Sequence, residues 1–283
     1  MASLVGLCHL MRLNKPIGIL LLLWPTLWAL WLAAGGFPGV TLFFIFTLGV
    51  VLMRSAGCVV NDIADRNVDG HVARTKSRPL AMRTVSVKAA LMTAFVLTLA
   101  AFLLVLMCNV FTVKLAFVGA ALAFIYPFLK RITHWPQLGL GLAFGWGVVM
   151  GFAAVTNHIP SLALWLYAAS IVWPLMYDTE YAMVDRADDI KIGVKSTAVL
   201  FGRRDCFMIG TLQLLFLWLM VIVGVKATLS FPYYASLFIA GIFFLYQQWL
   251  IKQRDPAQCF KAFLNNHWVG LVIFIGIVAA LGV

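Results

Sequence analysis

The amino-acid sequence predicts an all-α integral membrane protein with about nine transmembrane helices. Of its 283 residues, 63% are hydrophobic and only 11% are charged, which is far from the composition of a soluble domain. Apolar runs of about 20 residues recur along the whole chain without a long polar linker. The runs are continuously apolar, whereas strands of a membrane barrel would alternate, so helices are favoured. The pattern predicts a single polytopic transmembrane domain over residues 1–283.

Nine runs are long and apolar enough to be transmembrane helices. They cover residues 16–34, 40–62, 85–107, 111–129, 136–156, 160–184, 205–224, 231–250 and 266–282. The first follows Arg12 and Lys15 as the core of a signal peptide would, but it is longer than a typical cleaved core, so we expect it to remain as a span. The five cysteines are widely separated, which favours neither a zinc site nor a disulfide framework.

The basic residues predict how the chain is oriented. With the N-terminus in the cytoplasm, every Lys and Arg except Lys114 and Lys226 lies on the cytoplasmic side. We therefore expect a cytoplasmic N-terminus and cytoplasmic loops after the second, fourth, sixth and eighth spans. The net charge of +11 then reflects short basic loops beside an anionic leaflet. This predicts membrane lipid, but no nucleic acid, among the partners.

The acidic residues are concentrated in two short windows. Of the ten Asp and Glu residues, all but Asp205 and Asp255 lie in residues 61–69 or 177–189. The first window is at the cytoplasmic end of the second span, and the second window is at the same end of the sixth. A membrane protein without a charged ligand would have no reason to gather its carboxylates in this way.

Helical spacing would bring these acidic side chains together. If the helices continue into the windows, Asn61, Asp65 and Asp69 share one face, as do Asp185 and Asp189. Carboxylates one turn apart repel each other, and near a membrane they also lose hydration. Mg²⁺ would relieve both costs, because it takes hard oxygen ligands and is often shared between carboxylates and substrate phosphates. Two such windows could face each other across a diphosphate.

Two other interpretations of the windows are open. Each window could be a solvated helix end whose charges only mark the interface, although the presence of two on helices of the same orientation disfavours this. The windows could also coordinate an ion in transit through a channel or carrier, but transport sites tend to lie near the bilayer midplane. The spacing of 120 residues between Asp69 and Asp189 suggests two repeats of four helices followed by a ninth.

Longer strings of residues carry a resemblance to one family of membrane enzymes. The strings surround both windows and the loops near them: Lys15–Gly18, Leu22–Leu32, Arg54–Asp62, Asp65, Arg66, Asp69–His71, Arg78–Leu80, Tyr126–Phe128, Lys130, Arg131, Tyr177–Thr179, Tyr181–Arg186, Asp188, Asp189, Lys191–Gly193, Lys195–Thr197, Tyr246–Gln248 and Cys259–Phe263. The sequence is similar to the UbiA-type intramembrane aromatic prenyltransferases and, within them, to the bacterial 4-hydroxybenzoate polyprenyltransferases of ubiquinone synthesis. One departure is Arg83, where family members often have glycine.

The resemblance implies nine spans around a central cavity that opens sideways to lipid. It implies a Mg²⁺-dependent enzyme of the bacterial inner membrane whose substrates are a polyprenyl diphosphate, octaprenyl by default, and 4-hydroxybenzoate. The ligands it implies for metal or diphosphate are Asn61, Asp65, Asp185 and Asp189, with Asp62, Asp69 and Asp178 in support. The residues it implies for the diphosphate are Arg66, Lys130, Lys191 and Lys195. Arg131 is expected to bind the carboxylate of 4-hydroxybenzoate through its planar guanidinium.

In the implied reaction, Mg²⁺ helps the allylic carbon–oxygen bond to ionise, and the ring carbon ortho to the hydroxyl attacks the cation. Asp69 or Asp185 would take the ring proton or polarise the phenol. Another acceptor, such as a naphthoate, a homogentisate or haem, is the main alternative, and residues 181–186 and 191–197 favour the benzoate branch. A phosphotransferase of the CDP-alcohol type would need a longer signature built on Asp-Gly and Ala-Arg, which the sequence does not contain.

Overall fold

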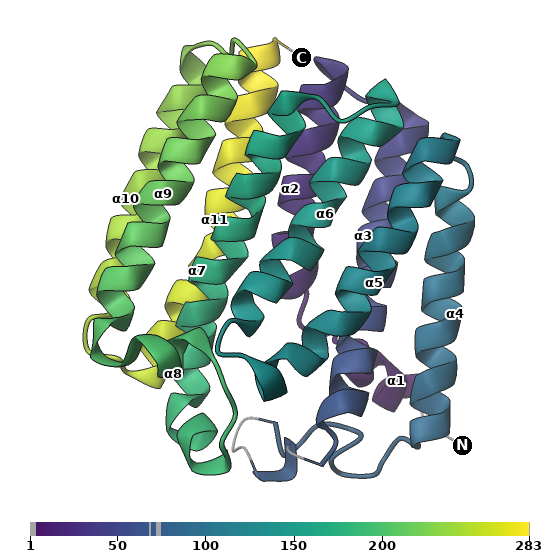
Figure 1. Ribbon diagram of the computed structural model, residues 1–283, viewed down its shortest axis with the longest axis vertical. Coiled ribbons are helices and arrows are strands. Elements are labelled where there is room, and N and C mark those ends of the chain that lie inside the picture. Colours follow the sequence, from purple (N-terminus) through teal and green to yellow (C-terminus); the bar gives the residue numbers. More distant parts are fainter. Residues whose placement is uncertain (1–3, 68, 72–74, 283) are drawn as a thin grey trace.

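The computed structural model describes residues 4–67, 69–71 and 75–282, and its regular elements are helices. They are α1 (Leu4–Leu10), α2 (Ile17–Ala34), α3 (Val40–Asp65), η1 (Asp69–His71), α4 (Val87–Val105), α5 (Val110–Ile132), α6 (Pro136–Thr156), α7 (Ser161–Ile192), α8 (Thr197–Phe201), η2 (Gly202–Arg204), α9 (Asp205–Lys226), α10 (Phe231–Ile251) and α11 (Pro256–Leu281). No strand occurs within the described residues, so the all-α prediction is confirmed. The long helices run side by side, and α1 and α8 lie at one end of the bundle (Figure 1).

Each predicted span corresponds to one long helix. Within the described residues, eight helical segments are long and apolar enough to cross a membrane. The ninth long helix, α7, is less apolar because its C-terminal part carries the second acidic window. Several of its polar side chains, including Thr179 and Glu180, are buried inside the protein, and it packs between α6, α9 and α11. The prediction of a multi-pass helical membrane protein is confirmed.

Both acidic windows depend on where their helices end. Helix α7 continues to Ile192, beyond the predicted end of the span, so Asp185 and Asp189 lie one turn apart on a continuous helix. Helix α3 ends at Asp65, and Asp69 belongs to the separate helix η1. The expectation that Asp69 shares a helical face with Asp65 is therefore wrong.

The last helix begins ten residues earlier than expected, at Pro256 instead of residue 266. Its N-cap is Asp255, whose side chain accepts a hydrogen bond of 3.0 Å from the amide of Gln258. Proline is favoured at the first helical position because it has no amide hydrogen to satisfy there. The early start brings the beginning of α11 beside the acidic end of the molecule.

The loop before α4 explains why the chain tolerates the departure at Arg83. Arg83 has a φ of 58°, in the left-handed region that glycine occupies most easily. Its amide donates to the carbonyl of Leu80 at 3.2 Å, and the amide of Thr84 donates to Pro79 at 2.9 Å. The side chains of Leu80 and Val85 on either side are buried. The loop therefore keeps a turn suited to glycine even though an arginine occupies it.

Helices α2, α7 and α11 approach each other closely around three aromatic rings. Trp28 and Trp173 are fully buried with ring centroids 5.1 Å apart, and Trp28 Nε1 donates to the carbonyl of Gly270 at 3.1 Å. A Cβ at Gly270 would lie 2.2 Å from Trp24 Cδ1 and 2.7 Å from Trp173 Cη2. Glycine is therefore required at this position so that both indoles can pack against α11.

Gly270→Ala is expected to lower the thermal unfolding midpoint of the detergent-solubilised protein, because overpacking a core costs about 1–3 kcal/mol. Gly241→Ala is the matched control. A Cβ added there would lie 3.8 Å from the nearest side-chain atom, Cδ1 of Leu217, which is an ordinary contact. There the intrinsic helix preference for alanine is expected to preserve or raise the midpoint. Equal midpoints for the two variants would contradict the packing described here.

A buried carboxylate at the start of α9 joins three segments. Asp205 is fully buried and accepts hydrogen bonds from Arg186 of α7 at 2.8 Å and from Arg254, before α11, at 2.7 Å. The amide of Cys206 also donates to it at 2.7 Å. Arg186 follows Asp185 directly, so its attachment to Asp205 fixes the rotation of α7 at the second acidic window.

Asp205→Ala is expected to destabilise the protein by about 1–3 kcal/mol, because it removes the carboxylate that joins Arg186 and Arg254, two side chains that are partly exposed and can be hydrated. Asp255→Ala removes only an exposed helix cap and is expected to cost about 1 kcal/mol. Thermal unfolding of both variants in one detergent checks this difference. A midpoint for Asp205→Ala as high as that of Asp255→Ala would show that the cluster does not hold the helices together.

Candidate active site

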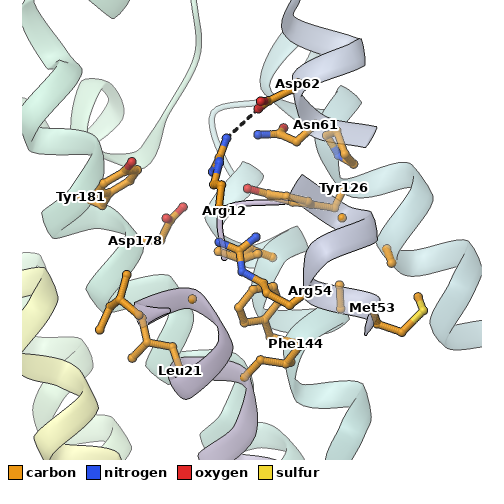
Figure 2. Close-up of a pocket in the computed structure, with 18 of the residues that line it drawn as sticks. Arg12, Leu21, Met53, Arg54, Asn61, Asp62, Tyr126, Phe144, Asp178 and Tyr181 are labelled. Carbon is orange, nitrogen blue, oxygen red and sulfur yellow. Dashed lines mark hydrogen bonds and ion pairs between the residues drawn. The ribbon is translucent and has the colours of Figure 1, made fainter. Parts of the chain in front are cut away.

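A large cavity runs between the helices from the end that carries both acidic windows into the bundle. Its volume is about 1110 Å³, and its walls come from α2 to α7 and from the start of α11. Asn61 and Asp65 line it from α3, and Asp178, Asp185 and Asp189 line it from α7. Figure 2 shows Asn61 and Asp62 on one side of the cavity, with Asp178 and Tyr181 opposite. The prediction of a central cavity is confirmed.

Two arginines hold the first window in place. Asp62 is 1% exposed and accepts a hydrogen bond of 2.7 Å from Arg12, which is drawn in Figure 2. Arg78 Nη1 lies 3.1 Å from the same oxygen of Asp62 and donates to both oxygens of Asp69, at 2.9 and 3.0 Å. Burial raises the pKa of the Asp69 carboxyl, and the charge of Arg78 opposes that rise. The N-terminal segment, α3 and η1 are joined by this network.

Asp65 has one oxygen in an ion pair and one without a partner. Its carboxylate is buried, and Oδ2 pairs with Lys130 Nζ of α5. Oδ1 is buried and accepts no hydrogen bond. An unsatisfied buried carboxylate oxygen is costly, so this atom is suited to bind a ligand that supplies positive charge. Asn61, one turn earlier on α3, lines the same cavity and adds an amide oxygen.

The second window contributes one face of α7. Asp178, Asp185 and Asp189 all line the cavity, and Asp189 is only 9% exposed. Asp188 is not among the lining residues, and its carboxylate lies 3.5 Å from Lys191 Nζ in a partly exposed pair. The adjacent residues Asp188 and Asp189 therefore differ, and only Asp189 lines the cavity, because successive residues of a helix point in different directions.

Two of the four lysines and arginines predicted for the diphosphate line the cavity. They are Lys130 and Lys195. The amide of Lys195 donates to the carbonyl of Lys130 at 3.2 Å, and Lys195 Nζ donates to the carbonyl of Ile132 at 3.0 Å. The loop after α7 is thus attached to the end of α5, which places two cationic side chains beside the carboxylates.

The other predicted basic residues lie outside the cavity lining. Arg66 is exposed and donates to the carbonyl of Ile63 at 3.2 Å, and Lys191 pairs with Asp188. Arg131 is also exposed and donates to the carbonyl of Ala64. Their predicted contacts with substrate stay predictions.

Arg54 is a cavity residue whose role the sequence reasoning missed. It lies in α3 with its guanidinium carbon 5.6 Å from the ring centre of Phe144, and Nη1 donates to Cys58 Sγ at 3.1 Å. Nε is buried without a hydrogen-bond partner. A Cβ at Gly18 would lie 2.3 Å from Nε, so the guanidinium needs that glycine. The available signal was a charged residue inside an apolar span, which by itself indicates a functional site.

The cavity residues fit Mg²⁺ held jointly with a diphosphate. Among the described residues, no three His, Cys, Asp or Glu side chains are grouped so that they could hold a metal ion by themselves. Magnesium usually keeps several waters and binds to one or two carboxylates together with substrate phosphates. The free oxygen of Asp65 and the facing carboxylates of α7 are the hard oxygen donors that such a site needs.

Solved structures share this architecture. A UbiA homologue from Aeropyrum pernix K1 superimposes with a TM-score of 0.82 at 22% identity, covering 92% of this chain and 97% of that one. A UbiA homologue from Archaeoglobus fulgidus, solved bound to GPP and Mg²⁺, gives a TM-score of 0.74 at 18% identity and covers 98% of this chain and 100% of that one. At these identities the similarity supports the fold.

Sequence comparison gives closer relatives. The chain is 55% identical over 277 residues to the 4-hydroxybenzoate octaprenyltransferase of Saccharophagus degradans, covering 98% of this chain and 92% of the relative. It is 56% identical over 276 residues to the enzyme of the same name from an Enterobacter species, covering 97% and 95%. The model of the UbiA prenyltransferase family matches residues 22–275. The chain therefore belongs to the UbiA prenyltransferase family.

Proposed function

We propose that the protein transfers a polyprenyl group, octaprenyl by preference, from polyprenyl diphosphate to 4-hydroxybenzoate. The bond forms at the ring carbon ortho to the hydroxyl, and the products are 3-polyprenyl-4-hydroxybenzoate and diphosphate, as a step in ubiquinone biosynthesis. The observation that carries the proposal is one cavity that joins carboxylates of α3 and α7 to an apolar interior. The names of the relatives support the acceptor and the tail. The protein would act in the bacterial inner membrane with its N-terminus and acidic loops in the cytoplasm.

In this proposal, the donor diphosphate lies between the two windows. Mg²⁺, when bound there, would neutralise the charge that grows on the leaving diphosphate. The residues that would hold metal or diphosphate are Asn61, Asp65, Asp185 and Asp189, with Asp62, Asp69 and Asp178 in support. Lys130 and Lys195 line the cavity, which supports them as ligands of the diphosphate, whereas Arg66 and Lys191 would have to turn toward it.

The acceptor site has two candidates for binding the benzoate carboxylate. Arg131 was predicted for this role but donates to a backbone carbonyl outside the cavity lining. Arg54 lines the cavity and has a buried Nε without a partner, so a carboxylate there would satisfy it. We favour Arg54, because a guanidinium held against Phe144 is already oriented and loses little entropy on binding.

The chemistry then needs a proton acceptor and protection from water. Asp69 and Asp185 both line the cavity and are the candidates for taking the ring proton. The raised pKa of Asp69 suits proton transfer, although Arg78 occupies both of its oxygens. The apolar wall beyond Tyr126 excludes water from the allylic cation, and aromatic faces stabilise its charge.

Neighbouring carboxylates on α7 provide a matched test of the site. Asp189→Asn is expected to lower prenylation of 4-hydroxybenzoate by about a hundredfold or more, because it removes a charged ligand of the reaction centre. Asp188→Asn, one residue earlier and outside the cavity lining, is expected to keep nearly all of the activity. Purified protein, octaprenyl diphosphate and labelled 4-hydroxybenzoate with magnesium or with chelator give the measurement. Equal losses in the two variants would remove the support for this site.

Comparison of two acceptors tests the role of Arg54. Arg54→Gln is expected to raise KM for 4-hydroxybenzoate by at least about tenfold, since a charge-assisted hydrogen bond is worth about 1.5–3 kcal/mol. The same variant should have little effect on the use of phenol, which has no carboxylate. Arg131→Gln is the parallel variant. If only Arg131→Gln changes the ratio of KM for 4-hydroxybenzoate to KM for phenol, Arg131 and not Arg54 binds the benzoate carboxylate.

A further inference from the structure

Tyr177 of α7 carries a buried hydroxyl that the proposed chemistry does not use. The side chain is 1% exposed and lines the cavity, and among the described residues its hydroxyl has no hydrogen-bond partner. The ring is held by Trp173, which packs at right angles to it with centroids 5.5 Å apart, and by Phe263 of α11 at 6.0 Å. Burying a hydroxyl without a partner costs free energy. A fixed ring that presents such a hydroxyl is suited to bind a ligand.

The hydroxyl faces the cavity and not the apolar packing around the ring. The charged side chains that act on it are Asp178 of α7 and Arg54 of α3, and both line the cavity. The phenol of Tyr126, which lines the cavity from α5, is the next polar group in range. Arg54, Tyr126 and Asp178 surround the same space in Figure 2. The Tyr177 hydroxyl therefore belongs to the part of the cavity around Arg54.

Arg54 and Tyr177 lie at matching depths on two helices that both run toward the acidic windows. Arg54 precedes Asn61 by seven residues on α3, and Tyr177 precedes Asp185 by eight residues on α7. At 1.5 Å per residue, each lies about 10–12 Å deeper in the bundle than the predicted ligand on its own helix. A para-substituted ring bound by one end at this depth can point its other end toward the windows.

We propose that Tyr177 is a second residue that binds the carboxylate of the aromatic acceptor, through a hydrogen bond donated by its hydroxyl. The inference rests on the proposed function, in which Arg54 binds the same carboxylate. A carboxylate has enough lone pairs to accept from both groups, and its charge strengthens each hydrogen bond. Asp178 repels an anion bound here, and the second donor offsets this repulsion. An acceptor without a carboxylate leaves the buried hydroxyl unsatisfied, so Tyr177 favours acids over uncharged phenols.

Tyr177→Phe tests this, because it removes the hydroxyl and keeps the ring that packs against Trp173 and Phe263. It is expected to raise KM for 4-hydroxybenzoate by about tenfold, since a hydrogen bond to a charged group is lost. The inhibition constant of benzoate, a competitor with the carboxylate but no hydroxyl, should rise by the same factor. The kcat and the KM for phenol should stay close to the wild-type values.

Tyr167→Phe is the matched control on the same helix. Its hydroxyl donates to the carbonyl of Leu142 at 3.1 Å, and the residue is outside the cavity lining. This variant should leave all of these constants unchanged. Thermal unfolding in detergent adds a second measurement, because losing a hydroxyl without a partner should not lower the midpoint of Tyr177→Phe. A lower midpoint would show that the hydroxyl has a structural partner and would overturn the inference.

The kinetic constants separate this inference from the proposed function. Parallel rises for 4-hydroxybenzoate and benzoate, with none for phenol, support a contact with the carboxylate. A rise for 4-hydroxybenzoate and phenol without one for benzoate would place the hydroxyl at the phenol oxygen and overturn that contact. Unchanged constants in an active Tyr177→Phe variant overturn it as well and leave the proposed function intact. A wild-type protein that does not prenylate 4-hydroxybenzoate overturns the proposed function and this inference with it.

Discussion

The carboxylate of Asp65 is buried where the apolar bundle meets its polar end, and the rest of the site is arranged around its charge. Removing a carboxylate from water is expensive unless positive charge compensates for it. Lys130 compensates at one oxygen, while the other stays unsatisfied. The same ion pair joins α3 to α5, so the free oxygen is held at a fixed place in the cavity. A protein that maximised stability alone would not leave this atom without a partner.

Each acidic window is fixed by arginines, and none of these arginines pairs with Asp65. Arg12 and Arg78 attach the first window through Asp62 and Asp69. Asp205 attaches the second through Arg186, next to Asp185 on α7. These contacts link segments that are distant in the sequence, so the windows face each other before any ligand arrives. Such preorganised charges act on a transition state without having to be reoriented during the reaction.

Much of the fold was predictable, because apolar runs long enough to cross a bilayer have few structural alternatives. The departures come from short-range chemistry. Asp255 followed by Pro256 is a recognisable helix start, whereas the break after Asp65 has no comparable signal. Arg83 keeps a glycine-like turn because the flanking Leu80 and Val85 are buried. The single domain, the two four-helix repeats and the membrane orientation stay predictions.

The site was predictable in part. Helical spacing grouped Asn61 with Asp65 and Asp185 with Asp189, because those pairs depend only on local geometry. Which basic residues reach the cavity depends on how α5 and the loops pack, so Arg66, Arg131 and Lys191 could not be separated from Lys130 and Lys195 by sequence. Arg54 was overlooked because its charge was attributed to membrane orientation.

The structure of the product tests the central claim most directly. Wild-type protein, octaprenyl diphosphate, 4-hydroxybenzoate and magnesium should give a product whose NMR spectrum shows the tail on the ring carbon ortho to the hydroxyl. That result would show that the ring carbon, and not the phenol oxygen, attacks the allylic electrophile. An ether at the phenol oxygen, or no product with this acceptor while another aromatic compound is prenylated, would contradict the account.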